Sequence, residues 1–169
     1  MSQAFYLEGT TSLHERATIA AHGVMSRDTI LKLLNAALST KMTQLVRCKQ
    51  HYYSAGQDEV ALREELFEQA VEDSLHTDRL VERILQLGGL PDFGAQSLSE
   101  DAPSDHGATS VDLRGVLADY LAARHCAIES YRELVELIAS YDETTAGLLE
   151  DLMRRDQRYF DSLSRHLTV

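Results

Sequence analysis

Hydrophobic residues recur at helical spacing over four long stretches of the chain, separated by segments rich in turn-forming residues. A period of three to four residues predicts amphipathic α-helices at about 26–55, 58–87 and 110–140, and a fourth from just after YDETT to about residue 167. Ser26 or Asp28 is a suitable N-cap for the first helix, and GGLP ends the second. The pattern therefore predicts an all-α protein.

The connections between the helices predict how they are arranged. The first and last connections are short, so each joins a pair of antiparallel neighbours. Residues 88–110 contain both prolines and four of the nine glycines, and show no helical period. A link of this length allows a crossover along the whole bundle. We expect an N-terminal extension at 1–25, followed at 26–169 by a four-helix bundle with one long crossover between the second and third helices.

Each predicted helix places one charged residue inside its apolar stripe, where a hydrophobic residue is expected. These residues are Lys41, Asp73, Arg124 and Asp156. Each lies about 15 to 17 residues from the short turn that joins its helix to its neighbour, so a rise of roughly 1.5 Å per residue brings all four to mid-bundle. We expect two cations to meet two anions there, with His76 and Tyr159 in reach.

Composition and charge limit the classes of function. The formal net charge is -11 without any basic run, which argues against nucleic-acid binding. No apolar run is long enough to span a bilayer, and the N-terminus lacks the basic start and apolar core of a signal peptide. Cys48 and Cys126 form no CxxC motif and are expected to be reduced, packed thiols. We therefore expect a cytoplasmic protein that contacts neither membrane nor nucleic acid.

Four segments resemble the helices of bacterioferritins and related mini-ferritins. LNAALSTKMTQLVRCKQHYYSAG (34–56) is similar to the first helix, and RHCAIESYREL (124–134) and LLEDLMRRDQRYFDSL (148–163) are similar to the third and fourth. EDSLHTDRLVERILQLGGLPDF (72–93) is the most specific segment, because a histidine, DR, ERIL and GLP recur there at the family's spacing. The resemblance covers about residues 28–165 and implies a ferritin-like bundle.

The resemblance also implies where a metal centre would lie. Ferritin-like proteins hold two iron ions at mid-bundle with a lone glutamate on each of two helices and a Glu-x-x-His pair on each of the other two. The lone glutamates fall on Lys41 and Arg124, and the pairs fall on Asp73 with His76 and on Asp156 with Tyr159. Only the histidine is unchanged, and two ligands have reversed charge. We therefore expect a salt-bridge cluster in place of the metals.

Other features that the family implies are also altered. Ser74 occupies the position of the methionine that holds haem between two bacterioferritin subunits, so no haem is expected. We expect no resident cofactor. Iron is the one cofactor for which the resemblance leaves room. We expect the fourth helix to end the chain, and the short fifth helix that helps to build a 24-subunit cage to be missing. Assemblies of 24, 12 or 2 subunits, or mixed ones, all remain open.

Three functions follow from this pattern. The first is a cage, storage or structural subunit in iron homeostasis without a working ferroxidase centre, acting as a homo-oligomer or together with other ferritin-like subunits. The second is an active ferroxidase or other di-metal oxidase with displaced ligands, for which Glu72, Glu68 and His125 are candidates. Glu72 is the foremost of these, because the phase of the second helix is determined only to within one residue. The third is an interaction module that reuses the bundle.

Overall fold

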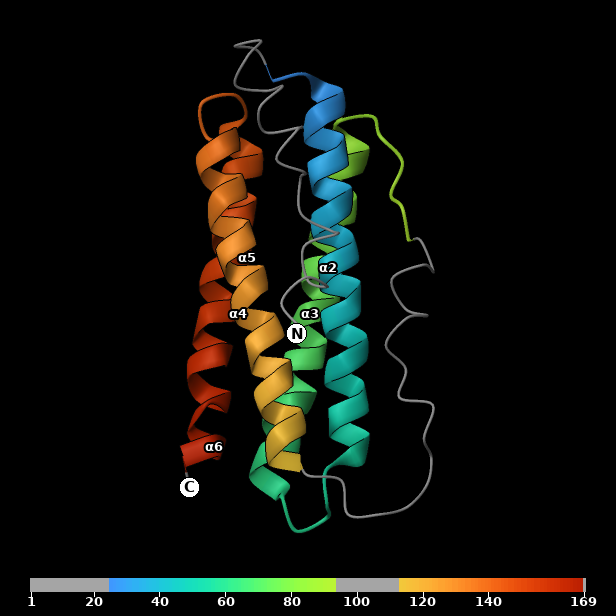
Figure 1. Ribbon diagram of the computed structural model, residues 1–169. Coiled ribbons are helices and arrows are strands. Elements are labelled where there is room, and N and C mark those ends of the chain that lie inside the picture. The colour runs from blue at the N-terminus through green and yellow to red at the C-terminus, as the bar shows by residue number, and fades with distance from the viewer. Residues whose placement is uncertain (1–24, 94–112, 169) are drawn as a thin grey trace, which may run out of the picture.

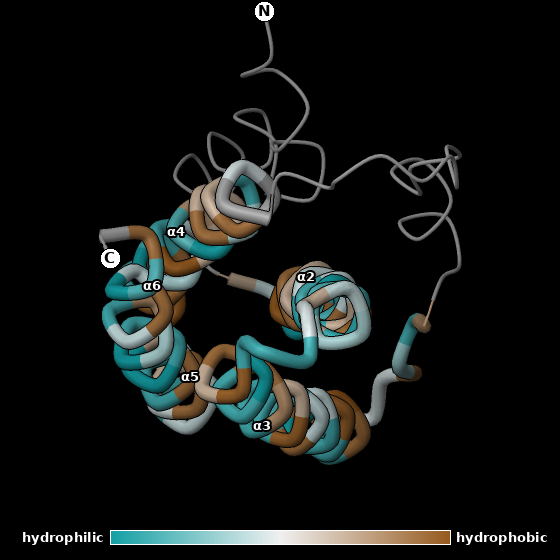
Figure 2. Tube along the Cα trace, turned by 90° about the horizontal axis from the view of Figure 1, so that it is seen from below, coloured by the Kyte–Doolittle hydropathy of each residue, from teal (hydrophilic) through white to brown (hydrophobic). Residues whose placement is uncertain are grey.

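A computed structural model describes residues 25–93 and 113–168, and every element in these ranges is helical. The helices are α2 (Arg27–Ser54), α3 (Val60–Gln86), α4 (Leu113–Ile138), α5 (Glu143–Leu163) and α6 (Arg165–Thr168). The four long helices lie side by side along a common axis (Figure 1) and surround a shared centre when they are viewed along that axis (Figure 2). The chain is an all-α four-helix bundle, as the hydrophobic pattern predicts.

The directions of the helices agree with the predicted crossover between α3 and α4. α2 packs mainly against α3, and α4 mainly against α5, and each pair is antiparallel. α3 ends at the top of Figure 1, whereas α4 begins at the bottom. The connection between them must therefore span the length of the bundle, which makes α4 parallel to α3. The predicted extension at 1–25 lies outside the described residues except for Met25, which packs in the core.

The helix ends follow local capping chemistry. Ser26 caps α2, since its side chain accepts a hydrogen bond from the Thr29 amide at 3.1 Å. α5 begins at Glu143, earlier than the sequence suggested, because the Asp142 carboxylate accepts from the Thr145 amide at 3.0 Å and draws the first turn into the helix. α5 also ends sooner than predicted, at Leu163, and the short α6 follows it.

The hydrophobic core is divided into two parts. One part joins the beginning of α2 to the end of α3, the second half of α4 and the first half of α5. The other part joins the end of α2 to the beginning of α3, the first half of α4 and the end of α5. On every long helix the predicted charged residue lies between the two parts. A polar layer therefore crosses the bundle at mid-height.

Candidate functional site

The polar layer contains a closed ring of four charged side chains, one from each long helix. The Lys41 ammonium donates to Asp73 Oδ1 at 3.1 Å and to both oxygens of Asp156 at 2.6 Å. The Arg124 guanidinium donates from Nη2 to Asp73 Oδ2 at 2.8 Å and from Nη1 to Asp156 Oδ1 at 3.0 Å. Each cation thus bridges both carboxylates, and the formal charges sum to zero.

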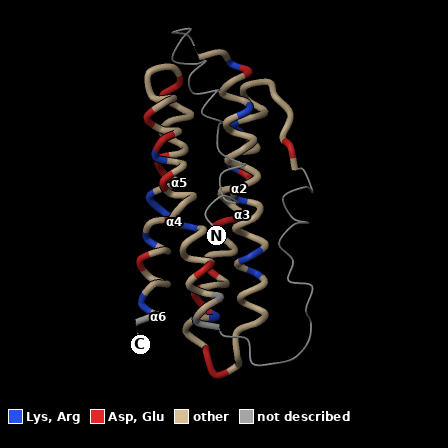
Figure 3. The backbone as a smooth tube through the Cα atoms, viewed as in Figure 1, with Lys and Arg blue, Asp and Glu red and all other residues tan. Residues whose placement is uncertain are grey.

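The ring is entirely removed from solvent. Lys, Arg, Asp and Glu positions occur along the full length of the helices (Figure 3), but within the described residues only these four have no exposed surface. Burial by itself raises the pKa of Asp73, and the charges of Arg124 and Lys41 outweigh this effect and hold it below its ordinary value. Pairing between opposite charges therefore keeps these groups ionised in a region that solvent does not reach.

Two further side chains complete the ring, and the sequence analysis did not single them out. Tyr120 accepts a hydrogen bond from Arg124 Nη2 at 2.7 Å, and Gln69 donates to Asp73 Oδ1 at 2.8 Å. Each lies four residues before the charged residue that it contacts, on the same helix face. Both residues could have been found from the sequence, because each is a polar residue one helical turn before a charged residue in an apolar stripe.

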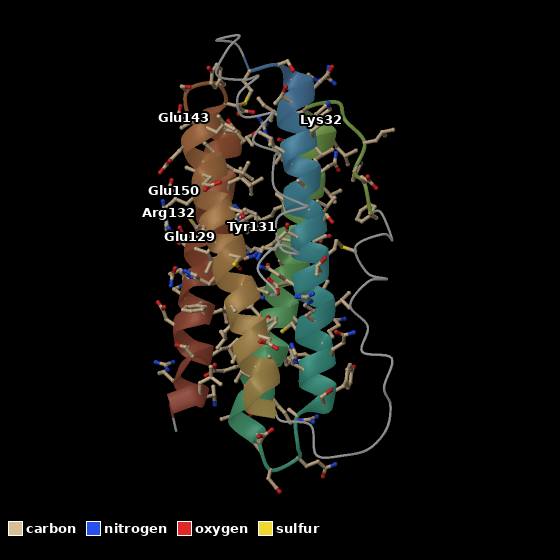
Figure 4. The ribbon with its side chains drawn as sticks, in the orientation of Figure 1. Lys32, Glu129, Tyr131, Arg132, Glu143 and Glu150 are labelled. Carbon is tan, nitrogen blue, oxygen red and sulfur yellow. The ribbon has the colours of Figure 1, made fainter. Side chains whose placement is uncertain are left out.

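Tyr131 and Cys48 pack around the ring. The Tyr131 ring of α4, labelled near mid-height in Figure 4, lies with its centroid 5.7 Å from the Lys41 ammonium. Burial raises the pKa of the Cys48 thiol to about 11, so this thiol is protonated and inert. Cys126 is exposed, so the prediction that it is a packed thiol was wrong. It lies two residues after Arg124, which turns its side chain to the opposite side of α4.

His76 is the predicted site residue that stays beside the ring without joining it. Its side chain is buried, and neither ring nitrogen has a hydrogen-bond partner among the residues that the structure describes. Its Nε2 lies 3.5 Å from Glu72 Oε2. Burial, and next the nearby charge of Lys41, lower the pKa of His76 to about 4, so the imidazole is neutral near pH 7.

The buried imidazole predicts a loss of stability in mild acid. In the unfolded chain His76 takes up a proton near its ordinary pKa of 6.5, whereas in the folded chain it does so only near pH 4. Its contribution is complete above pH 6.5 and is lost as the pH falls toward 4, which amounts to about 2 kcal/mol between pH 7 and pH 5. Urea unfolding at the two pH values measures this loss, and His76→Gln should reduce it. An equal loss in the variant would contradict the assignment.

The remaining predicted residues lie outside the ring. Glu72 faces α5 and accepts from Arg155 Nη1 at 3.1 Å, so the inward position belongs to Asp73. Tyr159 is half-buried, and no hydrogen bond joins it to the four charges among the described contacts. Glu68 is exposed, and so is His125, whose ring packs 5.5 Å from that of Phe160. None of these side chains replaces a missing metal ligand in the ring.

The donor atoms that are present do not fit a di-iron centre. Asp73, His76 and Asp156 each offer a ligand atom within 4.8 Å of the others, which is a partial set. A ferritin-like centre takes four carboxylates and two histidines for two ions. Here the Lys41 ammonium stands between the two carboxylates, at 2.6 and 3.1 Å from their oxygens. The space between the two carboxylates is therefore occupied by a cation of the chain itself.

The comparisons with known proteins agree with this architecture. Residues 31–169 match the family model described as the ferritin-like domain. The chain belongs to the ferritin family. A search among curated proteins finds no match. None of the helices in the described part is both long and apolar enough to cross a membrane.

Solved structures of ferritin-like proteins superpose on this chain. A dodecameric thioferritin from Bacteroides fragilis, related to bacterioferritin, has a TM-score of 0.73 at 23% identity, covering 92% of this chain and 93% of that one. An archaeal Dps homologue from Halobacterium salinarum gives 0.71 at 27% identity, with 83% and 80% covered. The bacterioferritin of Rhodobacter capsulatus gives 0.66 at 25% identity, with 86% and 87% covered.

Proposed function

We propose that this ferritin-family chain is a structural or storage subunit that lacks a ferroxidase centre of its own. The observation that supports this proposal is the position of the Lys41 ammonium, which donates to both buried carboxylates that the ring contains. Arg124 neutralises the same two carboxylates from the other side. A ligand set whose negative charge is already balanced offers little electrostatic attraction to a divalent ion.

The two cations of the ring oppose the entry of a metal ion. A divalent ion bound by Asp73 and Asp156 would lie close to the ammonium and the guanidinium. At about 4 Å and an effective dielectric constant of about 20, each pair of unit charges repels by roughly 4 kcal/mol, and a divalent ion doubles that figure. To escape this repulsion, Lys41 would have to leave a position that has no exposed surface.

A subunit of this kind serves iron homeostasis through assembly. It forms a cage from its own copies or joins other ferritin-like subunits that supply the oxidation centre. The formal net charge of -11 reflects an excess of carboxylates over cationic side chains. These carboxylates attract iron cations and so favour the growth of a mineral on the protein surface. The Bacteroides fragilis protein, which shares this fold, is a dodecamer, so an assembly of twelve subunits is one that the fold forms.

An anaerobic titration with Fe(II) tests the proposal. Calorimetry and native mass spectrometry of the wild-type protein should detect no tight site in the ring, and mixing with oxygen should give no rapid ferroxidase phase. Bacterioferritin treated in the same way is the positive control. Two tight iron sites per subunit would overturn the proposal.

A mononuclear metal site is the second candidate, because three donor residues lie close together. In this case Lys41 gives up its place, and Asp73, His76 and Asp156 hold one ion. The same titration separates the two candidates, since one ion per subunit with a proton released on binding favours the mononuclear site. His76→Gln should then weaken binding by a factor of 10 or more. The control is His125→Gln, which changes an exposed histidine outside the site and should leave binding unchanged.

A further inference from the structure

The bundle is made of two helical hairpins, α2–α3 and α4–α5, which meet along two seams. At the seam between α3 and α5, ion pairs join the hairpins near the surface. Arg83 lies 2.8 Å from Asp142, and Arg155 lies 3.1 Å from Glu72. Side chains of opposite charge therefore close this seam and remain partly in contact with solvent.

The seam between α2 and α4, named here the α2–α4 seam, is lined by small or uncharged side chains. Its half-buried residues are Thr29, Ala36, Thr40, Arg47 and His51 on α2, and Ala123, Ser130, Leu134 and Leu137 on α4. Each set recurs at three, four or seven residues, which places it on one side of its helix. The rings of His51 and Tyr120 lie 4.8 Å apart, so the two sides face each other.

The α2–α4 seam is poor in charge for a surface of this chain. From Thr29 to His51 it extends over about 33 Å, yet Arg47 is the one charged member of the two sets. Burial, and next the charge of Arg47, lower the pKa of His51, so its imidazole is neutral near pH 7. A long, half-exposed strip with so few charges is typical of a surface that another part of the protein covers.

We propose that residues 1–24 of the same chain cover the α2–α4 seam from its upper end in Figure 1 to the level of the buried ring. Residue 24 precedes Met25, which packs in the core beside the beginning of α2. The end of α4 lies at this same end of the bundle. The segment is therefore attached where the seam begins.

The length of this segment fits the distance to the ring. Twelve residues separate the upper end of the seam from Lys41, so the upper part of the seam is about 18 Å long. In the segment, Ser12 and Glu15 have the spacing of a capping box, and Gly23 is a residue that commonly ends a helix. The helix that this pattern predicts, at about 12–22, rises about 16 Å and spans nearly the same distance.

The side chains of the predicted helix also fit the seam. Leu13, Ala17 and Ala20 recur at helical spacing and form a narrow stripe of mostly small apolar residues. In the upper part of the seam they would meet Ala36 and Ser130, which are also small. Small residues on both sides allow helices to approach closely, so the stripe can exclude water from the seam.

The charges of residues 1–24 favour them over the crossover as the segment that covers the seam. Residues 1–24 contain two acidic side chains and one arginine, whereas residues 94–112 contain four acidic side chains and neither lysine nor arginine. A seam with a single cation cannot neutralise four carboxylates, and their burial without partners would be costly. The nearly neutral N-terminal segment avoids this cost.

Thiol labelling of the native, metal-free, full-length protein tests this contact. The variant Cys126→Ser, Ser130→Cys places one thiol in the seam, while Cys48 is buried and protonated and stays unlabelled as long as the bundle is folded. Adding Ala17→Asp puts a carboxylate on the packing stripe. The labelling rate at position 130 should then rise about tenfold or more, because it follows the fraction of molecules in which the seam is uncovered.

Two matched controls accompany this experiment. Ile19→Asp also replaces an apolar residue of the segment, but Ile19 is rotated by about 200° from Ala17 on a helix, so the rate at position 130 should stay within about twofold. Arg154→Cys in the Cys126→Ser background places a thiol on the exposed side of α5, and its labelling rate should not respond to Ala17→Asp.

Three results would overturn the proposal. The first is a rate at position 130 that Ala17→Asp leaves unchanged, and the second is an equal rise with Ile19→Asp. The third is protection that disappears as an oligomer dissociates on dilution, which would place the segment on a neighbouring copy. Iron binding bears on the proposed function and not on these rates, because no metal is added.

Discussion

Replacement of Lys41 by methionine should lower the free energy of unfolding by about 3–5 kcal/mol, which is the usual cost of breaking a buried ion pair by removal of one partner. The methionine fills nearly the same volume, so packing contributes little. The loss arises because Arg124 alone cannot neutralise two carboxylates, and Asp73 and Asp156 keep a net negative charge in a region without solvent. Urea unfolding at pH 7 and a fixed protein concentration measures the change.

Two controls separate pairing from packing in this experiment. Arg158→Met on the exposed side of α5 should change the free energy of unfolding by less than about 0.5 kcal/mol. Replacement of all four charged residues by methionine and leucine should restore the stability of the wild type or exceed it, because desolvation of buried charges offsets most of their attraction. A Lys41→Met variant as stable as the wild type would show that the ring does not hold the buried charges in balance.

The double variant Lys41→Glu, Arg124→Glu should gain a metal site that the wild type lacks. The two new glutamates would join Asp73, Asp156 and His76, whose ligand atoms already lie within 4.8 Å of one another. Without metal, four buried carboxylates repel, and the fold should be strongly destabilised. With a divalent ion at about 100 times its dissociation constant, about 2.7 kcal/mol of stability should return.

Thermal unfolding with increasing Co(II) or Mn(II) measures this gain, and native mass spectrometry counts the ions. Lys41→Met, Arg124→Met is the matched control, since it removes both cations without adding a ligand and should bind metal far more weakly. A double glutamate variant that folds in the presence of metal salts but binds no ion would contradict the equivalence of this ring to the family's metal position.

The hydrophobic pattern alone determined the helical class, the crossover and the level at which the charges meet. These features depend on the period of the α-helix and on the lengths of the connections, both of which are readable along a chain. Lys41 and Asp156 are 115 residues apart, yet each lies on the apolar stripe of its own helix at a similar distance from a turn. Their meeting therefore followed from sequence.

The tertiary structure alone decided which groups bond to one another. The closure of four charges into a ring depends on how each helix is rotated about its axis. The same holds for the hydrogen bonds from Gln69 and to Tyr120 and for the burial of the His76 imidazole. One residue corresponds to a rotation of about 100°, so the choice between Glu72 and Asp73 required the packed bundle. Packing of the two core halves sets that rotation, because it buries one face of all four helices together.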